Sequence, residues 1–340
     1  MKNRRNLLLY LFLWAVLAVV FYASLFIGSV HVDSSEIRSI LRCLVTRQLP
    51  DGRNLYNLIV YVRMPRLVLN ILAGAVLSMA GILMQTLTHN PLAEPYVLGV
   101  SSGASTGAAG AIVFHWFAFL RGGRVFFSAF VFSFIAITIV LLLQGRSTSS
   151  VRLVLTGMGV SAFFQAATTL IVYMARDEAQ ARSAQFWITG SFSGSDWTDV
   201  RLSAAAAVML LVFCLITEKE LDLLLLGRNA AAQTGLNVRI LYLAVIGFTS
   251  LAVSVIVAQT GIVGFVGLII PHMMRKAAGA GHRWLILCSS LAGGIFLMLA
   301  DTFARTAFAP QELPIGVMTA FIGAPVFLFI IHRVYHEDNS

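Results

Sequence analysis

The fold is decided by the stretch from Arg63 to Gly107, RMPRLVLNILAGAVLSMAGILMQTLTHNPLAEPYVLGVSSGASTG. It contains two apolar runs, each about as long as a bilayer span, joined by a polar turn with prolines. The first run follows a pair of arginines, and the second is rich in Gly, Ala and Ser. Irregular backbone at membrane depth is tolerated only where other protein or a water-filled cavity satisfies its polar groups. This stretch therefore predicts part of a path through which a solute moves.

Composition identifies the chain as an integral membrane protein. The chain is 58% hydrophobic and 11% charged, whereas soluble domains have about 25% charged residues. The formal net charge is +9, but the Lys and Arg residues are scattered between apolar runs and form no basic face. This pattern argues against nucleic-acid binding and favours contact with membrane lipid and acidic protein partners.

Runs without Asp, Glu, Lys or Arg predict ten spans in one polytopic domain, residues 1–340, which is an all-α fold. The basic N-terminus followed by Leu7–Val30 is expected to be a retained first span, because its apolar run is too long for a signal peptide. Ile240–Met274 is too long for one span, so we expect a break near Thr260 and a short helix ending near His272. The other expected spans are Leu67–Thr88, Pro95–Leu120, Val125–Gly145, Leu153–Ala175, Leu202–Thr217, Trp284–Ala300 and Leu313–His332.

An even number of spans puts both termini on one side of the membrane. The 24 Lys and Arg residues divide evenly between the two sides, so the positive-inside rule does not decide the orientation. The basic N-terminus favours cytoplasmic termini. Residues 31–62 are then an outer loop, and 217–239 lie on the cytoplasmic side.

Six motifs in order give the chain a specific resemblance. They are R-M-P-R at 63–66, G-A-V-L-S-M-A-G at 74–81, N-P-L-A-E-P-Y-V-L-G-V-S-S-G-A at 90–104, G-F-V-G-L-I-I-P-H at 264–272, A-D-T-F-A-R at 300–305, and E-L-P-I-G-V with I-G-A-P at 312–325. The chain resembles the permease subunits of type II ABC importers for ferric siderophores, haem and vitamin B12, the FecCD-type family. The resemblance implies ten helices, a homodimer with the path between subunits, two cytoplasmic ATP-binding subunits, and a periplasmic or lipoprotein substrate-binding protein. It also implies a bacterial or archaeal cytoplasmic membrane.

The chain carries no G-x-x-x-x-G-K-[ST] motif for binding phosphates. We therefore expect a transporter subunit that is not an enzyme and binds no cofactor, with ATP and Mg on the partner ATPase subunits. The cysteines make no disulfide or metal pattern, so no metal site is expected.

Three arginines are candidates for docking the binding protein. Arg63, Arg66 and Arg305 lie at the predicted outer ends of spans. In the family that the chain resembles, arginines at matching positions pair with acidic residues of the binding protein, which favours orientation and association rate. The alternatives are snorkelling to lipid headgroups and, for Arg63, a structural role beside Pro65.

The polar segment 217–239 predicts a short helix, a break at Gly227 and a second helix ending at Gly235. The resemblance makes it the pair of coupling helices that dock on the ATPase, with the contact residues Leu226, Gly227, Arg228, Asn229, Ala230, Ala231 and Gly235. The alternative is an amphipathic linker on the membrane surface.

Candidates for the pathway or its gate are Gln85, Asn90, Ser101, Gly103, Gly157, Gln165 and Gly323. We expect the path to involve the fifth and tenth spans. The competing interpretation is a structural turn at Asn90, with Glu94 capping the third span, and close helix packing at the small residues.

His272 and Asp301 are ionisable groups near predicted helix ends. Asp301 lies four residues before Arg305, which predicts an ion pair along one helix. His272 after Pro271 is expected to cap a broken helix.

These patterns favour the permease of an ABC importer, with a ferric siderophore as the first choice of cargo and haem, cobalamin or an oxyanion as alternatives. A gradient-driven secondary transporter of a small solute is the main rival, since broken helices also mark substrate sites there. A membrane enzyme is a third possibility, for which the chain shows no cluster of nucleophile, base and metal ligands.

Overall fold

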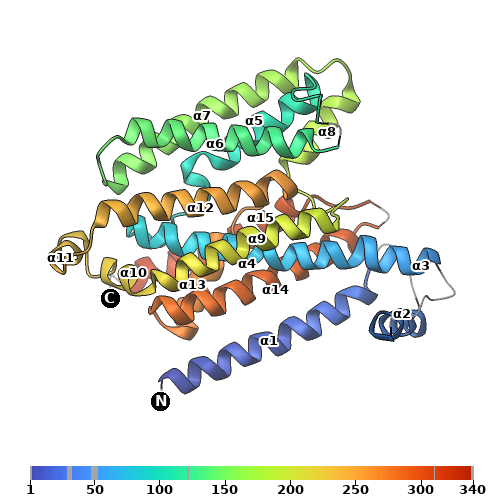
Figure 1. Ribbon diagram of the computed structural model, residues 1–340, viewed down its shortest axis with the longest axis horizontal. Helices are drawn as coiled ribbons and strands as arrows, with labels where there is room; N and C mark the ends of the chain where they lie inside the picture. The colour runs from blue at the N-terminus through green and yellow to red at the C-terminus, as the bar shows by residue number, and fades with distance from the viewer. Residues whose placement is uncertain (1, 29–32, 47–52, 121, 310, 338–340) are drawn as a thin grey trace.

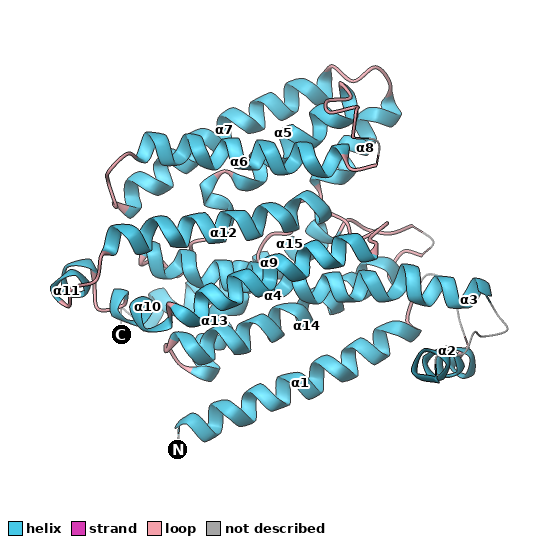
Figure 2. Ribbon diagram, viewed as in Figure 1, coloured by secondary structure: helices cyan, strands magenta, loops and turns pink. Residues whose placement is uncertain are grey.

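The computed structural model describes residues 2–28, 33–46, 53–120, 122–309 and 311–337. These residues form helices and connecting loops, without a strand among them (Figure 2). The first half of the chain contains α1 Lys2–Phe26, α2 Ser34–Thr46, α3 Arg53–Asn57, the π-helix η1 Leu58–Arg63, α4 Met64–Thr88, the 3₁₀-helix η2 Pro95–Leu98, α5 Val100–Val113, α6 Arg124–Gln144 and α7 Ser150–Tyr173. The second half contains α8 Glu178–Ile188, α9 Trp197–Ile216, α10 Glu218–Leu224, α11 Arg228–Gln233, α12 Val238–Thr260, α13 Val266–Ala278, α14 His282–Thr306 and α15 Ile315–Glu337.

Each of the ten predicted spans corresponds to a helix. Seven described helices are long and apolar enough to cross a membrane, and Ile315–Phe329 forms a shorter apolar helix in α15. The remaining two, α5 and α13, are only 14 and 13 residues long. At about 1.5 Å rise per residue, both are shorter than the roughly 30 Å hydrocarbon core.

Several expected boundaries were wrong. The third span ends at Val113 rather than Leu120, because the chain turns through left-handed backbone at His115 and Phe117. The second begins before Leu67, since α3, η1 and α4 run on as one helical rod. The described part of the predicted outer loop 31–62 therefore contains helices, and its residues 31, 32 and 47–52 lie outside the described chain.

The break after Thr260 is confirmed, but α13 continues past His272 to Ala278. His272 therefore lies inside a helix and does not cap one. The helix tolerates Pro271 because a neighbouring side chain replaces the hydrogen bond that proline cannot donate. The carbonyl of Gly267, four residues before Pro271, accepts instead from Gln85 Nε2 at 3.2 Å.

Helix α4 is the centre of the bundle. It packs against α9, α12, α13 and α14, and 78% of its most apolar window is buried, compared with 17% for α1. The axes of α4 and α14 approach closely at Gly74 and Gly293, where a Cβ on either residue would collide with the backbone of the other helix. Small residues at such a crossing let helices pack in an environment where lipid competes for apolar surface.

The bundle has two distinct ends (Figure 1). We call the end where α1 begins, where α15 ends and where α10 and α11 lie, the terminal end (left in Figure 1). The opposite end carries α2, α3 and α8. The predicted docking arginines belong to the opposite end, and the predicted coupling segment belongs to the terminal end.

Candidate functional site

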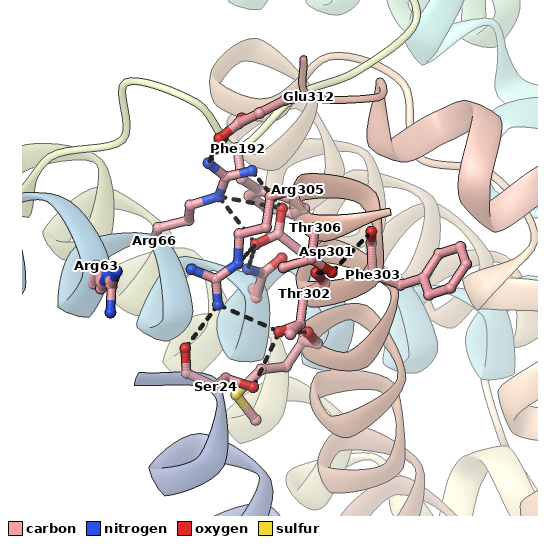
Figure 3. A network of polar contacts seen from close by, with 12 residues as sticks. Ser24, Arg63, Arg66, Phe192, Asp301, Thr302, Phe303, Arg305, Thr306 and Glu312 are labelled. Atoms are coloured by element: carbon pink, nitrogen blue, oxygen red, sulfur yellow. Dashed lines mark hydrogen bonds and ion pairs between the residues drawn. The ribbon is translucent and has the colours of Figure 1, made fainter. Parts of the chain in front are cut away.

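The predicted docking arginines lie inside a polar network at the opposite end, where α4, α14 and Glu312 of the connection to α15 meet (Figure 3). Arg66 donates Nη2 to Asp301 Oδ1 at 2.8 Å and Nε to Asp301 Oδ2 at 3.0 Å. Its Nη1 donates to Glu312 Oε1 and Oε2, each at 3.0 Å. One planar guanidinium thus holds two carboxylates from different segments, the geometry for which arginine is suited.

The other two arginines bond to the end of α1. Arg63 Nη1 donates to the Leu25 carbonyl at 2.6 Å, and Arg305 Nη2 donates to the Ser24 carbonyl at 2.8 Å. Arg63, Arg66 and Arg305 are exposed by only 4%, 9% and 4%. All three guanidinium groups therefore have partners within the chain, and their extension into solvent would require those contacts to change.

The predicted ion pair along α14 is secondary to a pair between helices. Arg305 Nε lies 4.0 Å from Asp301 Oδ2, which is too long for a hydrogen bond. Asp301 instead bonds Arg66, and its Oδ2 also accepts from Asn70 Nδ2 at 3.0 Å. Because α4 packs against α14, Arg66 and Asn70 come within hydrogen-bond distance of the Asp301 carboxylate. Arg305, one turn along α14 from Asp301, does not.

An apolar cavity of about 700 Å³ lies beside α15. Its wall is formed by the end of α8, the loop between α12 and α13, and one face of α15, with lining residues Ile188, Ile262, Phe265, Val317, Ala320 and Phe321. Phe321 is 78% exposed in the single chain. A wall with so few polar groups can hold an apolar or large solute without strong specific contacts.

Glu94 holds the loop that forms one wall of this cavity. Its Oε1 accepts a hydrogen bond from the Phe265 backbone N–H at 2.9 Å, and Tyr96 donates its hydroxyl to the Val263 carbonyl at 3.0 Å. Glu94 was expected to cap the third span, but its side chain makes no capping bond there. It instead caps the start of α13, where the N-terminal N–H groups lack intrahelical acceptors.

The predicted pathway residues do not gather at one surface. A Cβ on Gly103 would collide with the Phe132 carbonyl oxygen of α6, and one on Gly157 with the Val97 carbonyl oxygen of η2. Gly323 packs directly against Phe265, which lines the cavity. The exposed Gln165 belongs to α7.

The other three candidates have local or helix-packing roles. Gln85 bridges α4 to α13, since its amide donates to Gly267 and Leu268 and its Oε1 accepts from Arg275 at 3.3 Å. Asn90 forms a turn through its Oδ1 and the Leu92 N–H at 2.9 Å. Ser101 is half-buried, and its backbone carbonyl accepts a hydrogen bond from the Ser105 hydroxyl within α5.

The predicted coupling segment has the expected form. Two short helices, α10 and α11, meet at Gly227, whose φ of 100° favours glycine. Leu226 is 71% exposed, whereas Ala231 is fully buried against the bundle. Arg228 ties the segment to α4 by donating Nη2 to the Leu87 carbonyl at 3.0 Å, and its Nη1 bonds the Thr148 carbonyl. Asn229 and Gly235 are exposed and Ala230 is half-buried.

Sequence reasoning missed a second contact of this segment. His282, at the start of α14, bonds Asp222 of α10 and Thr86 of α4. No motif marks these residues; the available signal was a charged residue and a histidine close to the ends of apolar runs. Among the described residues, no three His, Cys, Asp or Glu side chains are grouped so as to hold a metal ion.

Comparison with known proteins agrees with this architecture. The model of the FecCD transport family matches residues 16–333. The chain belongs to the FecCD transport family. It is a multi-pass membrane protein and the permease subunit of a bacterial or archaeal ABC importer, and it is not itself an enzyme.

Curated and solved relatives cover most of the chain. The hemin transport system permease of Yersinia pestis is 34% identical over 283 residues, which are 82% of this chain and 84% of that protein. The vitamin B12 import system permease of Salmonella paratyphi A is 37% identical over 270 residues, 79% of this chain and 82% of that protein. A solved inward-facing conformation of a transporter described as metal-chelate type superposes with a TM-score of 0.84 at 30% identity, covering 95% of this chain and 98% of that one.

Proposed function

We propose that this chain forms, as a homodimer, the membrane path of a binding-protein-dependent importer for a ferric siderophore. Haem and cobalamin are the neighbouring choices of cargo. The support comes from the relatives: one is named for hemin, one for vitamin B12, and the solved structure is described as metal-chelate type. A large metal chelate or tetrapyrrole is the chemistry that these names share.

The observation that carries the proposal is the apolar cavity bounded by α8, α15 and the loop at Phe265. A large cargo moves through a path only if it binds weakly enough to leave. A wall dominated by Ile188, Ile262, Val317, Ala320 and Phe321 offers apolar surface and few fixed hydrogen bonds. The binding protein would then select the cargo, and the permease would conduct what it is given.

A homodimer would enclose this cavity. Phe321 and Val317 are exposed in the single chain at 78% and 44%. Exposed apolar residues that line a cavity fit a surface completed by a second copy of the chain, with the path between the two subunits.

The opposite end would face the binding protein, with Arg63, Arg66 and Arg305 as its docking residues and both termini in the cytoplasm. Because Arg66 already holds Asp301 and Glu312, docking through it requires an exchange of carboxylates. Glu312 is the more exchangeable partner, since its side chain is 26% exposed and that of Asp301 is 1% exposed.

In the homodimer, the terminal ends of the two chains would contact the two ATP-binding subunits through α10 and α11, with ATP and Mg bound on those subunits. The exposed Leu226 at the turn offers an apolar anchor to a partner groove. The side chains of Arg228 and Ala231, in contrast, hold the segment to the bundle.

Cargo class is tested by uptake into proteoliposomes that contain the permease with its ATPase and binding protein. Radioactive ferric siderophore, haemin and cyanocobalamin are supplied separately, each with ATP inside the vesicles. ATP-dependent uptake of the siderophore alone supports the first choice. Uptake of haemin or cyanocobalamin in its place reassigns the cargo within the same class of importer.

A further inference from the structure

Three side chains link the predicted coupling segment to the interior at the terminal end. His282 Nδ1 lies 2.6 Å from Asp222 Oδ1 of α10, and His282 Nε2 lies 2.8 Å from Thr86 Oγ1 of α4. The carboxylate can only accept, so Nδ1–H donates to Asp222. In the neutral ring, Nε2 then accepts from the Thr86 hydroxyl. One imidazole therefore joins three helices.

The three linked side chains differ in burial: His282 and Thr86 are buried, and Asp222 is exposed. The side chain of His282 is 1% exposed and that of Asp222 is 48% exposed, while Thr86 is 2% exposed. Asp222 Oδ1 also accepts from the His282 backbone N–H at 3.0 Å. A carboxylate on α10 thus caps the start of α14, where negative charge is favoured.

Two further bonds join the same segment to the same turn of α4. His89 Nε2 lies 2.8 Å from the Leu224 carbonyl oxygen at the end of α10, and Arg228 donates to the Leu87 carbonyl at 3.0 Å. The last turn of α4 is therefore held by both helices of the coupling segment.

The chain that leaves this turn leads directly to the cavity wall. Residues 89–99 follow α4 and include Glu94, which accepts the Phe265 N–H at 2.9 Å. Phe265 has a φ of 68°, a conformation that is strained for a bulky side chain. It packs against Gly323 of α15 and lines the cavity. The coupling segment and the cavity wall are thus joined by contacts through α4 and residues 89–99.

We propose that His282 is a positioning residue for energy coupling. By bonding Asp222 and Thr86, it makes α10 and the end of α4 move as one unit, so that displacement of the coupling segment reaches Glu94, Phe265 and the cavity wall. This inference rests on the proposed function of 217–239 as the coupling segment. A purely structural cap of α14 would stabilise the fold without transmitting a response to ATP.

The test measures the cavity wall directly. The permease is purified with its ATPase in lipid nanodiscs, with Cys43, Cys214 and Cys288 replaced and Phe321→Cys as the single thiol. An impermeant maleimide reports the labelling rate at position 321, without nucleotide and after trapping with ATP and vanadate. In this reference protein we expect trapping to change the rate by about fivefold or more, a typical allosteric coupling.

His282→Ala is the decisive variant, because a side chain that is 1% exposed cannot contact the ATPase itself. We expect it to keep the ATPase bound and to lose most of the response to trapping. Asp222→Ala should also keep the ATPase bound and lose most of the response to trapping. It provides the test if His282→Ala does not fold. Asp222→Asn should restore the response, since its amide oxygen still accepts from His282. Arg283→Ala is the matched control: it removes a 4.0 Å ion pair from the exposed Arg283 to the partly buried Glu218, between the same two helices, and should retain the response.

Two results would overturn the proposal in distinguishable ways. If His282→Ala and Asp222→Ala bind the ATPase and respond to trapping as the reference does, the positioning role is wrong while the coupling segment stands. If the reference itself does not respond to ATP and vanadate although its ATPase is bound, the proposed function of the segment fails, and the inference fails with it.

Discussion

Arg66 of α4 and Asp301 of α14, 235 residues apart in the chain, form a buried ion pair in which both Nε and Nη2 of the guanidinium donate to the carboxylate. The pair joins two closely packed helices of the bundle at the end opposite the termini. Desolvating both charges is costly, and the cost is recovered only with good geometry and further hydrogen bonds. The bonds from Asn70 to Asp301 and from Arg66 to Glu312 supply these.

Removing the charge of Asp301 should destabilise the fold strongly. Asp301→Asn removes the negative charge that offsets the buried positive charges of Arg66 and Arg305. Breaking a buried ion pair costs about 3 kcal/mol or more. Thermal unfolding can be followed with a thiol-reactive dye, because Cys214 and Cys288 are buried. Glu312→Gln is the comparison and should cost about 1 kcal/mol or less, since this pair is partly exposed. Equal losses in the two variants would contradict the central role of Asp301.

The same Glu312→Gln change should strengthen docking if the binding protein uses Arg66. A neutral amide holds the guanidinium less firmly than a carboxylate, so exchange with an incoming acidic side chain becomes easier. We expect a gain of about 1 kcal/mol, roughly fivefold in Kd, measured by surface plasmon resonance on nanodiscs. Glu178→Gln, an exposed carboxylate at the same end, controls for the loss of negative charge alone. Docking through Arg66 is refuted if Glu312→Gln binds no better than this control.

Two glycines on α7 can be compared to test whether Gly157 serves close helix packing or a role in the path. A Cβ at Gly157 would collide with the Val97 carbonyl oxygen, whereas a Cβ at Gly159 meets no atom within 4 Å. Gly157→Ala should destabilise the protein by about 1–3 kcal/mol through overpacking. Gly159→Ala should be neutral or stabilise by up to about 1 kcal/mol through helix propensity. Unfolding measurements that rank the two variants in the opposite order would contradict the packing role.

Leu226 and Arg228 should have different effects, although they are two residues apart in the proposed coupling segment. Leu226→Ala removes an exposed apolar side chain, so we expect unchanged stability and about tenfold weaker binding of the ATPase, the loss of roughly 1.5 kcal/mol of apolar burial. Arg228→Ala removes bonds to Leu87 and Thr148 within the chain, so it should lower stability as well. Co-purification titrations and unfolding of each variant measure both quantities. Unaltered ATPase affinity in Leu226→Ala would remove Leu226 from the interface.

Local patterns were sufficient to place a helix at each expected span, but they did not predict α2 or α8. Each apolar run corresponds to a helix, seven of them long enough to cross a membrane, and the length of Ile240–Met274 together with its glycines predicted the break after Thr260. The break at Gly227 followed from a residue type that tolerates positive φ. These features depend on composition and on neighbours in the chain, which the sequence displays.

Partners between helices could not be predicted in this way. Asp301 was assigned to Arg305 because the two are four residues apart, but the nearer partner is Arg66, on a helix that the sequence does not place beside it. Pro271 was expected to help end its helix near His272, yet Gln85 satisfies the carbonyl that proline leaves free. Glu94 caps α13 rather than the helix that follows it. Each of these depends on which helices pack together.

The most direct test of the account is ATP-driven uptake in proteoliposomes that contain the permease, its ATPase and its binding protein. Ferric siderophore, haemin and cyanocobalamin are offered in turn, with ATP or a non-hydrolysable analogue inside and with ion gradients collapsed. We predict uptake of at least one cargo that requires hydrolysable ATP and the binding protein and that needs no gradient. Uptake that follows an ion gradient and is indifferent to ATP would contradict the account and favour a secondary transporter.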